Sequence, residues 1–301
     1  MMGTSSLLKL VRFPNVLIGF LTVFLGGLLA GASNIDDWII VSLHAISVAG
    51  FMSSWNVYND LMDIEGDLVN HPDRPLASGV ISNSTARIVA MVSLVVSIIG
   101  LLAAAGWVSI SGNNLSEWLP SLPIWFLALI LMIHYEFEGE HSLRLKHKGL
   151  PGNLAVSLLV GVVIIFGAAA VGDPYNPLVW CVGFSAFSIN SAREIIKDVE
   201  DMDGDVNRET LSMKIGSSQA RIVAWVMTLM GFALLFLPFG LDLLPSGFLI
   251  TMVPSILVLL AAKPHIHHGN DYTAQRMLRV AMLLGLLGFC AASILNDYFI
   301  Q

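Results

Sequence analysis

Charged residues are scarce in this chain. Only 12% of its 301 residues are Asp, Glu, Lys or Arg, whereas 55% are hydrophobic and the mean hydropathy is +0.76. A soluble domain usually carries about twice that share of charge, so a soluble globular protein is excluded. The only two cysteines, Cys181 and Cys290, lie in apolar stretches, which excludes a disulfide framework and is typical of small packing residues. The first apolar run has no evident signal-peptide cleavage site, so we expect it to remain as a membrane span.

Long apolar runs are what the sequence has instead. A transmembrane helix needs about 17–25 predominantly apolar residues. We find nine such runs, each bounded by Gly, Pro, Asn or charged residues, and therefore predict an all-α, polytopic membrane protein with nine transmembrane helices. The predicted spans are 13–32, 38–58, 87–110, 119–137, 152–171, 177–195, 219–239, 246–262 and 276–297.

The basic residues define an orientation. When the nine spans are threaded through a bilayer, all 15 Lys and Arg fall on one side, and the loops on the other side contain none. The positive-inside rule makes the basic side cytoplasmic, which places the N-terminus inside and the C-terminus outside. We therefore expect a multi-pass protein of the cell membrane whose polar chemistry lies on the cytoplasmic side.

The acidic residues are concentrated in two short segments. Residues 59–67 and 194–209 hold 11 of the 22 Asp and Glu. Both segments contain the pattern D-x-x-D-x-x-x-D, and on a helix this spacing would place three carboxylates on one face. Like charges so close together require a cation between them. The first motif is Asp60, Asp63 and Asp67, and the second is Asp198, Asp201 and Asp205.

The two motifs lie in a larger internal repeat. Four predicted spans separate them, so both must lie on the same, cytoplasmic side. The string Ala-Arg-Ile-Val-Ala occurs at 86–90 and again at 220–224, where it opens the span that follows each motif. These matches predict a single domain, 1–301, that contains a parallel repeat of about 38–171 and 177–297.

Clustered carboxylates at a membrane surface indicate a hard divalent cation. Oxygen ligands without Cys or adjacent His suit Mg²⁺ or Mn²⁺ and disfavour zinc. Mg²⁺ usually completes its coordination with phosphate oxygens, so the expected ligand is a phosphorylated substrate, in particular a diphosphate. An apolar bundle above such a site suits an isoprenoid tail and keeps water from a reactive carbocation. The nearby cations are Arg74, Lys146, Lys197 and Arg208.

At these residues the chain resembles the UbiA superfamily of intramembrane prenyltransferases, over nearly its whole length. The superfamily motif N-D-x-x-D-x-x-x-D begins at Asn59, and its second motif, D-x-x-x-D, matches Asp201 and Asp205. The resemblance implies nine helices and Mg²⁺ held by the aspartates of both motifs, which are also the expected catalytic residues. It further implies that Asn59 orients or ligates, and that phosphate oxygens are bound by Arg74 and Lys146, with Lys197 as a further candidate.

Three segments resemble one archaeal group within the superfamily. They are 70–79, 148–156 and 193–201, and the Arg12–Asn15 segment that opens the first span is similar to the family's start. The resemblance implies transfer of a geranylgeranyl group from its diphosphate to geranylgeranylglyceryl phosphate, forming the second ether bond of archaeal membrane lipid. The partners are then a prenyl diphosphate and a membrane lipid, with no nucleic acid and no obligate protein partner.

Some residues depart from this pattern or allow two interpretations. The family places a Tyr and a Lys close together after the fourth span, but Tyr135 and Lys146 are eleven residues apart here, and we expect the acidic stretch 136–141 between them to form a solvated turn. Asn15 and Asn190 lie within predicted spans, where an amide is costly in lipid. We therefore expect both to face the bundle interior, Asn15 either as a substrate contact or in plain helix packing.

Other functions remain as alternatives. The same donor chemistry could serve an aromatic acceptor such as 4-hydroxybenzoate, another quinone precursor or a chlorin. A cation-coupled transporter would also show repeats and acids, but transporters place their ion sites near the bilayer midplane. Here the acids lie at the ends of the spans. A CDP-alcohol phosphotransferase is disfavoured because its D-G-x-x-A-R core is absent.

Overall fold

The chain folds into a bundle of long helices. The computed structural model describes residues 4–137, 139–202 and 209–300, and within these ranges it contains helices and no strand. The prediction of an all-α fold is therefore confirmed for the described residues. The helices are α1 (Thr4–Leu10), α2 (Phe13–Leu29), α3 (Ile35–Met62), α4 (Ile64–Asn70), α5 (Asn83–Ser111), α6 (Leu115–Trp118), α7 (Ser121–Glu136), η1 (Leu145–His147), α8 (Leu150–Ala170), α9 (Pro177–Glu200), α10 (Leu211–Ile215), α11 (Ser217–Gly240), η2 (Ser246–Met252), α12 (Val253–His268) and α13 (Asp271–Ile300).

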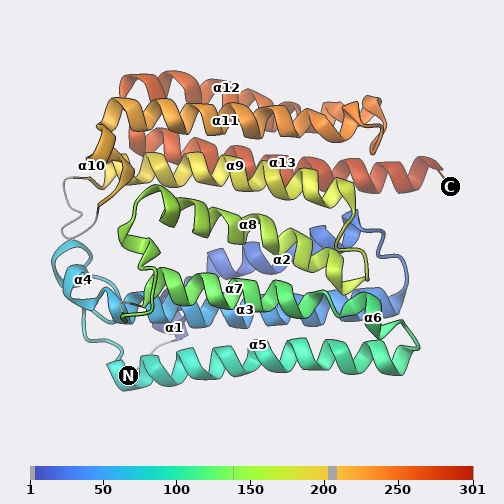
Figure 1. Cartoon of the computed structure of the whole chain (residues 1–301), viewed down its shortest axis with the longest axis horizontal. Coiled ribbons are helices and arrows are strands. Elements are labelled where there is room, and N and C mark those ends of the chain that lie inside the picture. Colours follow the sequence, from blue (N-terminus) through green and yellow to red (C-terminus); the bar gives the residue numbers. More distant parts are fainter. Residues whose placement is uncertain (1–3, 138, 203–208, 301) are drawn as a thin grey trace.

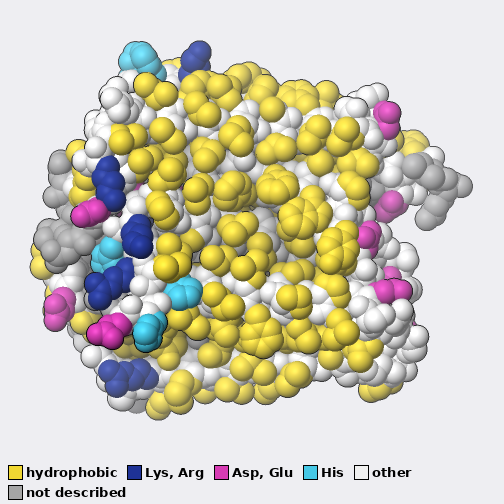
Figure 2. Space-filling view, viewed as in Figure 1, with side chains coloured by type: hydrophobic (Ala, Val, Ile, Leu, Met, Phe, Trp, Pro, Cys, Tyr) yellow, Lys and Arg dark blue, Asp and Glu magenta, His cyan; other side chains and the backbone are white. Residues whose placement is uncertain are grey.

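The long helices lie side by side along one axis and alternate in direction (Figure 1). Helix α13 ends at one end of the bundle, while α4, which carries the last aspartate of the first motif, and α10, which follows the second motif, lie together at the opposite end (Figure 1). On the face shown in Figure 2, apolar side chains cover the middle of the molecule, and the Lys and Arg side chains gather at this same end. The charge asymmetry expected from the sequence is therefore visible on this face.

Seven helices are long and apolar enough to cross a membrane, judged by length and composition within the described residues. They are Ile35–Met62, Asn83–Ser111, Leu115–Glu136, Leu150–Ala170, Ser217–Gly240, Ser246–His268 and Asp271–Phe299. The pair α1 and α2 passes the same test together but is bent by 62° between the two helices. Each of the nine predicted ranges overlaps a helix in the described part of the chain, but nine membrane crossings and a cytoplasmic N-terminus stay predictions.

Helix α9 is the long helix that fails this test. It packs against α8, α11 and α13, and most of its side chains are buried between them. Four of these buried side chains are polar, which makes the helix less apolar than its neighbours: Ser185, Ser188, Asn190 and Ser191. The Asn190 side chain donates a hydrogen bond to Ser157 Oγ at 3.1 Å. Helix α9 is thus a largely buried helix, and its Ser185, Asn190 and Ser191 side chains find hydrogen-bond partners inside the protein rather than in lipid.

Glycines allow α2 and α8 to touch through their backbones. A Cβ atom on Gly26 would lie 2.0 Å from the carbonyl oxygen of Ile164, and one on Gly167 would lie 2.2 Å from that of Val23. Small residues at a helix crossing permit this close approach in membrane proteins. This contact fixes the position of α2 against α8. It therefore also fixes the position of the turn that precedes α2, at the polar end of the bundle.

Helices α5 and α11 each follow an acidic motif and are placed alike. Helix α5 packs on α3, and α11 packs on α9. The alanines of the repeated string are completely buried in both copies: Ala86, Ala90, Ala220 and Ala224. This similarity is in line with the internal repeat, which stays a prediction. Helix α5 also exposes an apolar face suited to lipid, formed by Ile88, Val92, Val95, Ile99 and Leu102.

Candidate functional site

The first aspartate motif lies at a break between two helices. Helix α3 ends at Met62, Asp63 caps it with φ −91° and ψ 9°, and α4 begins at Ile64. Asp60 therefore belongs to α3 and Asp67 to α4, so the expectation that all three carboxylates share one helix face is wrong. A straight helix would stack like charges, whereas here the motif is divided between two helices and its carboxylates meet three cationic side chains.

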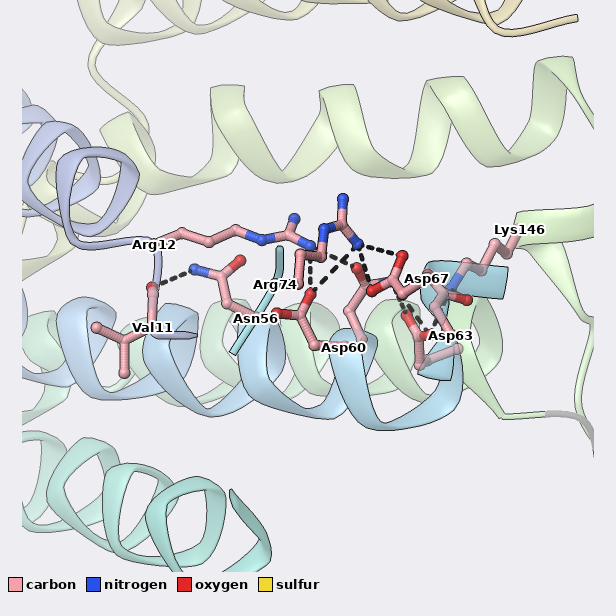
Figure 3. A network of polar contacts seen from close by, with 10 residues as sticks. Val11, Arg12, Asn56, Asp60, Asp63, Asp67, Arg74 and Lys146 are labelled. Atoms are coloured by element: carbon pink, nitrogen blue, oxygen red, sulfur yellow. Dashed lines mark hydrogen bonds and ion pairs between the residues drawn. The ribbon is translucent and has the colours of Figure 1, made fainter. Parts of the chain in front are cut away.

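Three cationic side chains contact this motif, two of them from distant parts of the chain and one from the segment that follows α4 (Figure 3). Arg12 Nη2 lies 2.6 Å from Asp60 Oδ1, and Lys146 Nζ lies 2.7 Å from Asp63 Oδ1. Arg74 Nη1 donates to both carboxylate oxygens of Asp67 at 2.7 Å and lies 3.7 Å from Asp60 Oδ1. Asp60 and Asp67 are only 3% and 6% exposed, so these ion pairs offset charges that are largely removed from water.

A buried glutamate joins this group of charges. Glu136, at the end of α7, is 3% exposed and accepts a hydrogen bond from Lys146 Nζ at 2.7 Å. Asn59 Nδ2 lies 3.2 Å from each of its carboxylate oxygens. The prediction of a solvated turn is therefore wrong for Glu136, because an ammonium and an amide stabilise its charge inside the protein. Glu140 is exposed, as expected, and Glu138 lies outside the described residues.

Lys146 reaches the first motif because the loop after α7 folds back toward the end of that helix. It lies on η1, ten residues after Glu136, and the loop brings its ammonium back to the end of α7. The long separation of Tyr135 and Lys146 in the sequence thus does not keep Lys146 from the first motif. Asn59, Arg74 and Lys146 are all brought together with the aspartates, and their proposed roles in substrate binding stay predictions.

Arg12 is a member of the site that the sequence reasoning did not single out. It lies between α1 and α2 in the left-handed region, with φ 54° and ψ 51°. Its Nη2 also donates to Asn59 Oδ1 at 3.0 Å, and Asn56 Nδ2 anchors the same turn by donating to the carbonyl oxygen of Val11 at 2.8 Å. The signal was a lone arginine at the start of an apolar run, where a charge needs a partner.

The second motif begins in the last turn of α9. Asp198 lies in the last turn and accepts a hydrogen bond from Asn153 Nδ2 at 2.8 Å, and Asp201 is the exposed residue that caps the helix. Partial burial raises the pKa of Glu200, which lies beyond the predicted span, and the neighbouring Asp201 carboxylate raises it further. Lys197 is exposed on the same turn. Asp205 and Arg208 lie outside the described residues.

The loop that carries Lys146 also contacts the chain that follows the second motif. Glu209 N donates to the carbonyl oxygen of His147 at 3.2 Å. Gly149 has φ +63°, and a Cβ atom there would lie 2.6 Å from Leu211 N, so only glycine fits this approach without strain. The same loop therefore contacts Asp63 through Lys146 and Glu209 through His147. These two contacts agree with both motifs lying at one end of the bundle (Figure 1).

Asn15 lies apart from the ion pairs of the first motif. Its Oδ1 accepts a hydrogen bond from Arg279 Nη2 at 2.9 Å, which links α2 with α13. Asn15 is exposed whereas Asn190 is buried, so the expected interior position is right for Asn190 and wrong for Asn15. A substrate contact by Asn15 stays a prediction.

The donor chemistry of the two motifs fits Mg²⁺. Carboxylate oxygens are the ligands that this ion prefers, and the described parts of both motifs provide them. Within the described residues no three acidic, His or Cys side chains are grouped as ligands of one metal ion, and the three first-motif carboxylates each face a cationic side chain instead. The structure thus shows the first motif neutralised by the protein's own cations, which a metal would have to displace.

These features define a membrane-embedded helical enzyme with paired aspartate motifs at one end of the bundle. The model of the UbiA prenyltransferase family matches residues 20–279, and the chain belongs to this family. It is therefore a prenyltransferase, as the resemblance of its motifs predicted.

Within this family, the chain is similar to an archaeal enzyme in sequence and to a solved structure of an enzyme with the same name. The chain is 35% identical to the digeranylgeranylglyceryl phosphate synthase of Methanopyrus kandleri over 289 residues, which cover 95% of this chain and 98% of that protein. A solved structure of a digeranylgeranylglyceryl phosphate synthase is also similar, with a TM-score of 0.72 and 25% identity over 96% of this chain and 98% of that one.

The fold is shared with a more distant solved structure as well. A UbiA homologue from Archaeoglobus fulgidus, bound to GPP and Mg²⁺, has a TM-score of 0.57 and 15% identity, and the match covers 95% of this chain and 99% of that one. The chain thus has the UbiA fold over almost its full length.

Proposed function

We propose that this protein transfers a geranylgeranyl group from geranylgeranyl diphosphate to the free hydroxyl of geranylgeranylglyceryl phosphate, in an Mg²⁺-dependent reaction. The observation that carries the proposal is the opposition of three carboxylates and three cationic side chains in the first motif. A set of exchangeable ion pairs is suited to a ligand that brings both metal cations and phosphate anions. The likeness to the Methanopyrus kandleri synthase supports this acceptor over an aromatic one.

The aspartates of both motifs are the proposed ligands of the metal, namely Asp60, Asp63, Asp67, Asp198, Asp201 and Asp205. Bound Mg²⁺ would supply charge neutralisation for the departing diphosphate, as in other metal-assisted reactions. The UbiA homologue from Archaeoglobus fulgidus that was solved with GPP and Mg²⁺ supports this choice of metal and donor class.

The cationic side chains are the proposed phosphate ligands. Arg74 presents a planar guanidinium that can bind two phosphate oxygens at once, and Lys146 presents an ammonium on a side chain that is only 5% exposed. Both are held by first-motif carboxylates and can turn to phosphate oxygens when those carboxylates take other partners. Asn59 keeps Arg12 and Lys146 in place through its contacts with Arg12 and Glu136. Lys197 is exposed at the second motif, where it can meet the same diphosphate.

The bundle has a further role in the proposed reaction. Its apolar helices accept the isoprenoid tail and exclude water from the carbon at which the diphosphate leaves, so the acceptor hydroxyl is the nucleophile that reaches it. The hydroxyl proton passes to one of the aspartates or to the released diphosphate. We place this chemistry on the cytoplasmic side, because the basic residues gather at the end of the bundle that holds both motifs (Figure 2).

A transfer assay tests the proposal. Purified protein with Mg²⁺ and labelled geranylgeranyl diphosphate is offered either geranylgeranylglyceryl phosphate or 4-hydroxybenzoate, with a chelator and Asp63→Ala as controls. We expect a diether product that requires Mg²⁺ and is lost in Asp63→Ala. Product from the aromatic acceptor alone would overturn the lipid assignment and retain the prenyl donor. Failure to bind the diphosphate at all would overturn the proposed role of both motifs.

A further inference from the structure

Among the residues that the structure describes, Glu136 is the one acidic member of this group of charges that belongs to neither aspartate motif. Its side chain is 1% exposed, and that of its partner Lys146 is 5% exposed. Asp63, the other carboxylate on Lys146, has a side chain that is 27% exposed. Lys146 thus has one carboxylate partner open to an incoming ligand and one that is enclosed by the protein.

The hydrogen bonds of Glu136 fix two neighbours at once. Its Oε1 accepts from Lys146 Nζ at 2.7 Å, and both of its oxygens lie 3.2 Å from Asn59 Nδ2. Because the Asn59 amide nitrogen faces Glu136, its oxygen is left to accept from Arg12 Nη2 at 3.0 Å. One buried carboxylate therefore determines the place of Lys146 directly and the place of Arg12 through Asn59.

We propose that Glu136 is a positioning residue that retains Lys146 and Asn59 when the first-motif aspartates exchange their side-chain cations for substrate. The inference rests on the proposed function, since it assumes that a diphosphate enters this site. A lysine ammonium has three donors. When Asp63 takes another partner, one donor stays on Glu136 and the others face the incoming phosphate oxygens, so Lys146 binds phosphate without first being ordered again.

The loop makes such an anchor necessary. Lys146 lies on a three-residue helix, η1, at the end of a long return from α7, and a flexible lysine loses much conformational freedom when it is held in place. Without Glu136, Asp63 would be the remaining carboxylate partner of the ammonium among the described residues, and Lys146 would lose that partner when the site fills. The buried ion pair of Glu136 and Lys146 therefore contributes more to the affinity for diphosphate than to the stability of the fold.

Direct binding separates this inference from the proposed function. The probe is inorganic pyrophosphate with Mg²⁺, titrated calorimetrically into wild type, Glu136→Gln and the matched control Glu140→Gln, whose glutamate is exposed on the same loop. We expect the Kd to rise about tenfold in Glu136→Gln and to stay within about twofold of wild type in Glu140→Gln. Binding by wild type with an unchanged Kd in Glu136→Gln would overturn the inference alone. No binding by wild type would overturn the proposed function.

Kinetics and a double variant exclude a purely structural role. In Glu136→Gln, the KM for geranylgeranyl diphosphate should rise about tenfold while the KM for the acceptor changes by less than about twofold. In a Lys146→Met background, Glu136→Gln should raise the KM for geranylgeranyl diphosphate by less than about a further twofold. The reason is that the lysine side chain that Glu136 positions is already absent. Two results would overturn the inference. One is an equal rise in the KM for the diphosphate and the KM for the acceptor, and the other is a further tenfold rise in the KM for the diphosphate in the double variant. If Glu136→Gln alone does not fold, the double variant, which leaves no unpaired buried charge, provides the test.

Discussion

The two aspartate motifs share one spacing and have different surroundings. The first spans a helix break and receives cations from three separate segments, at Arg12, Arg74 and Lys146. The second continues from a single helix end, where Asp198 is held by a neutral amide and Glu200 lies beside Asp201. In the described parts of the two motifs, identical spacing therefore supplies the same ligand atoms in different local structures.

The difference teaches how the protein manages concentrated negative charge. In the first motif the carboxylates are mostly buried, and burial of an unpaired charge would be costly, so the fold supplies partners. In the second motif Asp201 is exposed and its charge is solvated. The first motif thus receives cations from two distant segments, at Arg12 and Lys146, whereas Asp198 of the second motif receives an amide from α8.

The strongest test of the comparison is to remove one ligand from each motif. Asp67→Asn and Asp201→Asn should each lower kcat/KM for the prenyl diphosphate by roughly a thousandfold, because each variant removes a charged metal ligand. The measurement is product formation at saturating acceptor. If one variant kept near-normal activity, the two motifs would not form one site.

Replacing the guanidinium of the first motif should have the next largest effect. Arg74 donates to both oxygens of Asp67, and Arg74→Lys keeps the charge but loses the planar fork. We expect the KM for the diphosphate to rise by roughly thirtyfold, with a smaller change in kcat. The control is Arg276→Lys, an exposed arginine on α13 that contacts Tyr272. A similar loss in the control would show a general effect of surface charge.

Arg12→Gln should affect stability more than turnover. The change leaves the Asp60 carboxylate, 3% exposed, with Arg74 at 3.7 Å as its remaining cation. We expect a loss of about 1–2 kcal/mol, seen as a lower thermal unfolding midpoint without Mg²⁺. Added Mg²⁺ should raise this midpoint more in the variant than in wild type, because a bound metal replaces the missing cation. An equal effect of Mg²⁺ on both proteins would contradict this exchange.

The smallest effect is expected at the second motif. Asn153→Ala removes the amide that donates to Asp198 at 2.8 Å and leaves the aspartate in place. A hydrogen bond to a charged group contributes about 1.5–3 kcal/mol at most, and water can replace a partly exposed donor. We therefore expect kcat/KM to fall about threefold to tenfold, measured under the same conditions as Asp201→Asn. A loss as large as that of Asp201→Asn would make Asn153 a ligand-binding residue in its own right.

Much of this architecture could be predicted because it depends on local pattern. Long apolar runs specify membrane helices directly, and the repeated carboxylates specify oxygen chemistry wherever they are placed. Arg74 could be chosen because it is a basic residue close to an acidic motif in the sequence, and Lys146 because the resemblance to the UbiA superfamily implied its role. The structure brings both to the first motif.

The unpredicted part depends on contacts between distant segments. From the sequence, Glu136 is predicted to be a solvated turn residue. In the structure the loop folds back, and Lys146 donates a hydrogen bond to Glu136. Arg12 joins the site through a left-handed turn that no propensity favours for arginine. The helix break at Asp63 has no glycine or proline at the junction itself, so periodicity alone predicts a continuous helix there.

The polar interior of α9 has a consequence for biogenesis. A helix with Ser185, Ser188, Asn190 and Ser191 on buried positions partitions into lipid less readily than its neighbours when it leaves the translocon. Its polar groups find partners such as Ser157 on α8 and the carbonyl oxygen of Gly231 on α11. Stable insertion of α9 therefore depends on a helix made before it and on one made after it. The two halves of the chain must thus meet inside the membrane before the second aspartate motif can be held in place.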